Sequence, residues 1–143
     1  MLIVQDRFSK VLQAYPTISR EASQLASNLK HFVGLKSNSY TIVHSDAAGE
    51  ILKAVMENNW LPESSVPSRF PHNSVLEREM RTFQEIARSL FLQAGFAARP
   101  QLWPQACSYV ATAMSAFLKD GEGKTRWELA FRKEFLGPHD LLG

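Results

Sequence analysis

The sequence predicts one α/β domain with a mixed sheet flanked by helices, and three observations lead to that prediction. Short apolar runs suited to strands alternate with longer segments of helical periodicity. Two of these runs lie so close together at the start of the chain that they predict an antiparallel hairpin. The 143 residues are 45% hydrophobic and 21% charged, as in a globular domain with a core.

In chain order, the first half predicts three strands and two helices, followed by a weak edge strand. Residues 2–5 and 11–15 form the hairpin around a turn at 6–9. A helix from Ser19 to Val33 ends at Gly34, and a strand covers 40–43. The next helix is expected to end at two asparagines and to place four apolar residues inward, namely Ile51, Leu52, Val55 and Met56. Residues 60–69 after it can form only a brief edge strand.

A long helix follows, with its start at Ser74 and its end at Gly95. Its apolar stripe recurs every three or four residues, at Leu76, Met80, Phe83, Ala87 and Leu90. At 100° per residue, Glu77, Arg81 and Arg88 share one edge of that stripe. An ordinary surface ion pair between Glu77 and Arg81, four residues apart, explains part of this pattern without any function.

The last part of the chain predicts two more helices. Pro104 suits the first turn of a helix that runs to about Leu118 and is rich in alanine. Residues 125–128 have the spacing of a capping box and predict a short final helix. Regular structure is expected to end at Gly137.

Composition excludes several classes of protein. Cys107 is the single cysteine, so neither a disulfide partner nor a cysteine-based zinc site is expected. The opening apolar run is too short for a signal peptide, and no stretch approaches the length of a membrane span. An intracellular protein with no membrane partner is therefore expected. The net charge of +2 indicates no partner, although every cation from Arg69 to Arg99 is an arginine, which suits phosphate.

Two carboxylates are candidates for chemistry. Asp46 closes a predicted strand, where α/β folds place their ligands, and Glu77 lies in the first turn of the long helix. If the fold brings them together, their oxygens would suit magnesium, and two such ions clamp the attacking and leaving oxygens of a phosphoryl transfer. The plainer alternative is that Asp46 caps a helix and that Glu77 interacts favourably with the positive end of a helix dipole.

Several segments resemble one known family. Residues 43–50, Val-His-Ser-Asp-Ala-Ala-Gly-Glu, resemble the strand-end HSD-x-x-G-E of retroviral and retrotransposon integrase cores. Residues 69–78 are similar to the N-x-x-x-E-R segment of that family, and Leu102-Trp-Pro-Gln-Ala106 to its helix–tryptophan–helix run. Residues 6–16 look like its D-x-F-S hairpin, and residues 124–128 with the tail look like the segment after the core in copia-type polyproteins. The resemblance spans nearly the whole chain.

The resemblance implies a ribonuclease-H-like fold and a DNA strand transferase that carries out DNA integration. The family holds two Mg²⁺ or Mn²⁺ ions with two aspartates and a glutamate. By position, Asp46 matches the second aspartate and Glu77 the glutamate, so both are expected to be catalytic and metal-binding. Asn73 matches the asparagine before the helix, and Arg78, Arg81 and Arg88 are expected to face DNA. DNA and a second copy of the chain are thus the expected partners.

Departures from the family pattern modify this expectation. The strand that carries the first aspartate would precede Leu2, and Asp6 matches the hairpin aspartate instead, so we expect an N-terminally incomplete core. With one carboxylate missing, metal binding should be weak and the fragment inactive alone, whether through truncation or decay. Residues 1–118 would then be a partial core and 119–143 a short helix and tail. The alternative is a non-catalytic ribonuclease-H-like domain of a degenerate retroelement that binds nucleic acid or dimerises. A eukaryotic retroelement would place either in the nucleus.

Overall fold

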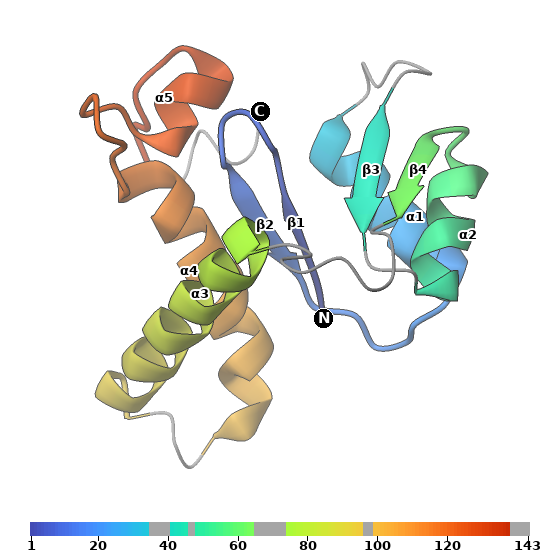
Figure 1. Ribbon diagram of the computed structural model, residues 1–143. Coiled ribbons are helices and arrows are strands. Elements are labelled where there is room, and N and C mark those ends of the chain that lie inside the picture. Colours follow the sequence, from blue (N-terminus) through green and yellow to red (C-terminus); the bar gives the residue numbers. More distant parts are fainter. Residues whose placement is uncertain (35–40, 46–47, 65–73, 96–98, 138–143) are drawn as a thin grey trace. The chain divides into compact units, whose positions relative to one another are not determined.

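The computed structural model describes residues 1–34, 41–45, 48–64, 74–95 and 99–137 (Figure 1). The chain forms two compact units. The first comprises residues 1–2 and 17–81, and the second comprises 3–16 and 82–143. The long helix α3 (Ser74–Gln93) contributes its first turns to the first unit and the remainder to the second.

The first unit contains helices α1 (Ala22–Val33) and α2 (Gly49–Glu57) and strands β3 (Ile42–Ser45) and β4 (Leu61–Ser64). The strands are parallel, in a register that runs from Ile42 opposite Leu61 to Ser45 opposite Ser64. A parallel pair needs a crossover connection, which α2 supplies. The two helices pack through Leu25, Ala26, Leu29, Ala54 and Val55, all buried.

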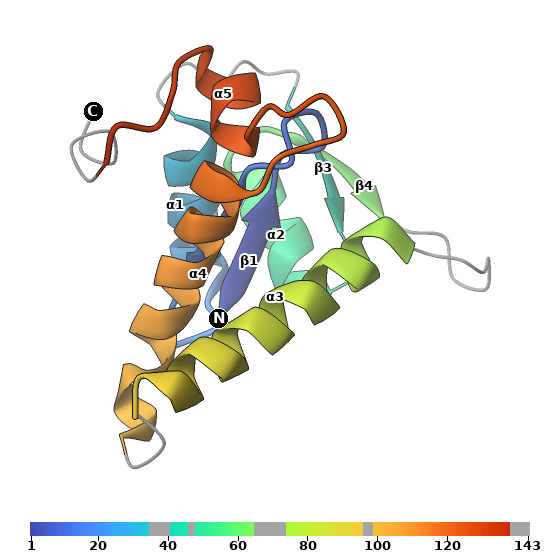
Figure 2. The ribbon, with the colours of Figure 1, turned by 90° about the vertical axis from the view of Figure 1, so that its left-hand side faces the viewer.

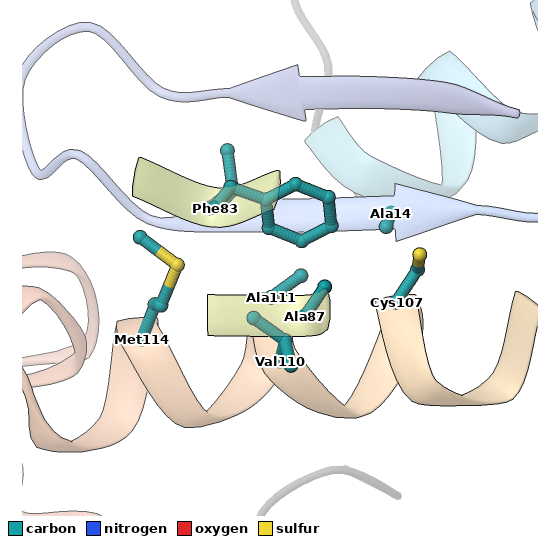
Figure 3. Close-up of a cluster of buried hydrophobic side chains, with 8 residues drawn as sticks. Ala14, Phe83, Ala87, Cys107, Val110, Ala111 and Met114 are labelled. Atoms are coloured by element: carbon teal, nitrogen blue, oxygen red, sulfur yellow. The ribbon is translucent and has the colours of Figure 1, made fainter. Parts of the chain in front are cut away.

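The second unit is built on the hairpin of β1 (Leu2–Gln5) and β2 (Leu12–Tyr15). The 3-10 turn η2 (Pro100–Leu102), α4 (Trp103–Phe117) and α5 (Arg126–Phe131) follow α3. The core joins β2, α3 and α4 (Figure 3) through Leu12, Ala14, Phe83, Ala87, Cys107, Val110, Ala111 and Met114. The end of α3 and the start of α4 lie side by side in both views (Figures 1 and 2), where the rings of Phe91 and Trp103 meet edge to face at 5.4 Å.

Serine hydroxyl groups of α4 form hydrogen bonds with the backbone of β2. The Leu12 amide donates to Ser115 Oγ at 2.8 Å, and that hydroxyl lies 3.0 Å from the Leu12 carbonyl oxygen. Two helical turns earlier, Ser108 Oγ donates to the Ala14 carbonyl at 3.1 Å. Edge strands carry unpaired backbone groups that need partners when buried, and here serine side chains provide them.

The predicted mixed α/β class is confirmed, and so are the main element boundaries. Gly34 and Gly95 end their helices with positive φ angles of 84° and 69°, and Thr125 and Glu128 form the predicted capping box. Within the part of the chain that is described, the strands pair two by two, β1 with β2 and β3 with β4.

Three details differ from prediction. Helix α1 begins at Ala22, three residues later than expected. Strand β3 begins at Ile42, two residues later than expected, and reaches Ser45. The predicted inward position of Met56 is wrong, because its side chain is 61% exposed. The small side chain of Ala54, fully buried, occupies the packed face instead, as its position three residues after Ile51 allows.

Candidate active site

The carboxyl end of β3 is the first part of the candidate site. The strand ends at Ser45, and α2 starts at Gly49 after the extended residue Ala48. Asp46 therefore belongs to the short connection between a parallel strand and its crossover helix, which is where α/β folds place ligands. Asp46 itself lies outside the described residues, so its role as a metal ligand remains a prediction.

A pair that the sequence analysis did not single out stands beside this connection. His44 on β3 is the register partner of Glu63 on β4, and His44 Nδ1 lies 3.4 Å from Glu63 Oε2. Both side chains are partly exposed, at 36% and 57%. Only the parallel register of two strands 19 positions apart reveals this pair, and that register is not visible in the sequence. It places a carboxylate and an imidazole together next to the end of β3.

The second part of the candidate site is the start of α3. The helix begins at Ser74 as predicted, with Glu77 exposed in its first turn. The positive end of the helix dipole stabilises an anion there. Within the described residues, Glu77 and Arg81 form no ion pair, so the carboxylate is not committed to that neighbour.

The three predicted DNA-facing arginines are all exposed on α3, whereas Phe83 and Ala87 on its other face are buried. These exposures confirm the predicted amphipathic pattern. The arginines are Arg78, Arg81 and Arg88. Asn73, predicted to contact DNA just before the helix, lies outside the described residues.

The side chains that could act as ligands determine whether the described residues can bind a metal ion. Carboxylate oxygens are the ligands that magnesium prefers, and Glu77 offers one exposed carboxylate. Among the residues that the structure describes, no three histidine, cysteine, aspartate or glutamate side chains are close enough to hold an ion. Cys107 is buried, and burial raises the pKa of its thiol, which disfavours the thiolate that metals bind. The predicted magnesium site includes Asp46, which is not among these residues.

Over the same described residues, no helix is both long and apolar enough to cross a membrane.

Comparison with known proteins gives matches among solved structures alone, since no protein-family model and no curated protein matches the chain. A chain of the simian T-cell lymphotropic virus intasome in complex with PP2A regulatory subunit B56 gamma is 19% identical, with a TM-score of 0.68. That match covers 95% of this chain but only 49% of the viral chain, so the chain spans about half the length of this neighbour.

Two isolated catalytic cores match at similar strength. The catalytic core domain of BIV integrase is 16% identical, with a TM-score of 0.62 over 99% of this chain and 88% of that one. The HTLV-2 integrase catalytic core domain in complex with magnesium, in a trimeric form, is 13% identical, with a TM-score of 0.63 over 89% of this chain and 81% of that one. The predicted resemblance is thereby confirmed at the level of fold, and the chain has the ribonuclease-H-like fold of retroviral integrase catalytic cores.

Proposed function

We propose that this chain is the core of an integrase-type DNA strand transferase. The observation that carries the proposal is the fold, shared with integrase cores over 89–99% of the chain. The order of the sequence motifs supports it, because the His44-Ser-Asp46 motif precedes the Glu77-Arg78 motif along the sequence, as in the family that the chain resembles.

The metal pair in this proposal is Asp46 and Glu77. One of the neighbours is an integrase core in complex with magnesium, and the two carboxylates offer the hard oxygen ligands that Mg²⁺ or Mn²⁺ requires. The bound ions would stabilise the charge that develops on the oxygens of a phosphodiester under attack. The exposure of Glu77 leaves its carboxylate accessible to an ion and to DNA.

Arginines on α3, together with Asn73, provide the proposed DNA surface. The first and last of Arg78, Arg81 and Arg88 are ten positions apart on one helix, or roughly 15 Å at 1.5 Å per residue. That length matches about four base pairs at 3.4 Å each. Guanidinium groups bind phosphate oxygens through a fixed fork of donors, which suits this role better than lysine would.

The pair supplies two of the three carboxylates that the family uses. We do not count Asp6 as the third, because it matches the hairpin aspartate of the family and its Oδ2 accepts hydrogen bonds from the amide and hydroxyl of Ser9, both at 2.6 Å, inside the hairpin turn. We therefore propose that these two carboxylates by themselves bind metal weakly and that strand transfer needs a third acidic ligand. A nuclear location and assembly with further copies follow from the same proposal.

The test is magnesium-dependent nicking of a labelled duplex by a polypeptide extended upstream of Met1 along the natural reading frame. We expect nicking by the extended protein and its loss in both Asp46→Asn and Glu77→Gln. The matched control is Glu50→Gln, which changes an exposed carboxylate on α2 and should keep activity. Nicking that survives either site substitution would contradict the proposal.

A second candidate is a non-catalytic domain of the same fold that binds nucleic acid or dimerises. It is favoured by the exposed arginines of α3. DNA binding that is equal with magnesium and with EDTA, in a protein that never nicks, would identify this candidate.

A further inference from the structure

A surface cleft lies in the second unit, away from the residues assigned above. Its volume is about 520 Å³, and it is formed by the β1–β2 turn and by α5 with the residues that follow it. The turn contributes Phe8, whose side chain is 82% exposed. The remaining lining residues are Lys124, Glu128, Leu129, Arg132, Lys133 and Glu134. The turn and α5 are fastened together where Arg126 Nη1 donates to the Lys10 carbonyl at 3.2 Å.

One of the two carboxylates that line this cleft, Glu128, accepts a hydrogen bond from local backbone, as does Asp120 in the turn before α5. Glu128 Oε2 accepts from the Thr125 amide at 2.6 Å, and Asp120 Oδ1 accepts from two amides at 2.9 Å. Hydrogen bonds from Thr125 hold the pKa of Glu128 below its usual range, with smaller contributions from Lys119 and Lys124. Three cations line the cleft against two carboxylates.

Backbone strain singles out one of those cations. Arg132 ends α5 with φ of 56°, in the left-handed region where helices ordinarily place glycine. That conformation is unfavourable for a residue with a side chain. Arginine at this position places a guanidinium beside the cleft, which glycine would not. Lys10 in the adjoining hairpin turn also has a positive φ, 63°, so two strained positions on this side of the unit carry cations.

An exposed aromatic ring beside arranged cations is the chemistry that binds single-stranded nucleic acid, because bases stack on aromatic rings while basic groups contact phosphates. We propose that this cleft binds single-stranded nucleic acid, with Phe8 stacked on a base and Lys124 and Arg132 on the neighbouring phosphates. Each of these three side chains lines the cleft. The site uses neither Asp46 nor Glu77, so it extends the proposed function without depending on it.

Anisotropy of a fluorescein-labelled 12-nucleotide oligothymidylate, titrated with the full chain, measures the stacking contribution. Removing one base–aromatic stack should weaken binding about tenfold, so Phe8→Ala and Phe8→Leu should both show that loss, whereas Phe8→Trp should bind at least as well as the unaltered chain. The matched control is Ile18→Ala, which removes another fully exposed apolar side chain, in the first unit, and should change nothing. Full affinity in Phe8→Leu would instead indicate a simple apolar contact and would overturn the proposal.

Arg132→Gly separates binding from stability. Glycine relieves the positive φ, so the melting temperature should stay unchanged or rise by up to about 3 °C. Oligothymidylate affinity should fall, and the slope of log affinity against log salt should shrink by roughly 0.7, the value for one phosphate contact on a single strand. The control is Lys53→Ala, which removes an exposed cation from α2.

Unchanged affinity in Arg132→Gly, or a loss of affinity that accompanies a lower melting temperature, would contradict the proposal.

A 12-base-pair duplex is the second probe, and its binding should respond to Arg81→Gln on α3 more than to Phe8→Ala. An acidic peptide is the third, and tighter binding of polyglutamate than of oligothymidylate would identify a peptide site instead. Asp46→Asn and Glu77→Gln should leave oligothymidylate binding unchanged, so this proposal and the proposed function can fail separately.

Discussion

Replacing Ser115 by alanine removes one buried hydroxyl that serves both backbone groups of Leu12. Ser115 is 2% exposed, and its Oγ accepts from the Leu12 amide at 2.8 Å. The single hydroxyl proton is shared between two acceptors at 3.0 Å, the carbonyl oxygens of Leu12 and Ala111. Since Leu12 is itself 2% exposed, water cannot readily replace the lost partner.

The expected cost follows from these contacts. A buried amide left without an acceptor costs about 1–3 kcal/mol, and the carbonyl of Leu12 loses a donor as well. Alanine recovers about 0.5 kcal/mol through its better helix propensity. The Ser115→Ala protein should therefore be less stable by about 2 kcal/mol, which corresponds to a melting temperature lower by roughly 4–8 °C.

Urea denaturation followed by circular dichroism measures this change as a shift of the midpoint with an unchanged slope. Thr112→Ala is the matched control, because Thr112 Oγ1 donates at 3.1 Å only to Ser108 in its own helix. A bond of that kind adds little to a helix, so the control should differ from the unaltered chain by less than about 0.5 kcal/mol. If Ser115→Ala and Thr112→Ala unfold alike, the closure of the β2 edge by serine is not a significant source of stability.

Three further predictions concern titration and charge. Glu128 has a pKa below its usual range in the folded chain, chiefly because the Thr125 amide donates to its carboxylate, so its contribution to stability is present above the unfolded value of about 4.3 and is lost as the pH falls through the folded value. Urea midpoints from pH 6 to pH 3 should therefore drop less in Glu128→Gln, which has no carboxyl group to titrate, than in the unaltered chain. Burial raises the pKa of Tyr15 to about 12, so its contribution to the stability of the fold is complete below about pH 10 and is lost as the pH rises through about 12. The difference in tyrosinate absorbance between the unaltered chain and Tyr15→Phe, followed against pH, measures this titration. On duplex DNA, Arg81→Gln and Arg88→Gln should each reduce the salt slope by about 0.9 if each removes one phosphate contact, while Arg20→Gln, exposed in the first unit, should leave it unchanged.

Local signals in the sequence predicted the helices well because they act within a few residues. The stripe that includes Phe83 and Ala87 located the buried face of α3, and Gly34 and Gly95 located two helix ends. The capping box at Thr125 was predicted from a spacing of three residues and is confirmed down to both hydrogen bonds. Each of these features depends on backbone geometry that one short segment determines by itself.

Features that depend on distant residues could not be predicted in the same way. The His44–Glu63 pair requires the parallel register of β3 and β4, and the Ser115–Leu12 bonds join positions 103 residues apart. The cleft beside Phe8 likewise brings the hairpin turn to α5. Glu77 was found as an exposed first-turn carboxylate, as the helical pattern indicated, but its relation to Asp46 stays a prediction.

A crystal structure of the chain soaked with Mn²⁺ tests the proposed metal pair most directly. We predict anomalous density for an ion bound by Asp46 and Glu77 together, at oxygen–metal distances of roughly 2.0–2.6 Å, and its disappearance in Glu77→Gln. Carboxyl groups that point to opposite faces of the β3–β4 sheet, or an ion held without either of them, would contradict the assignment.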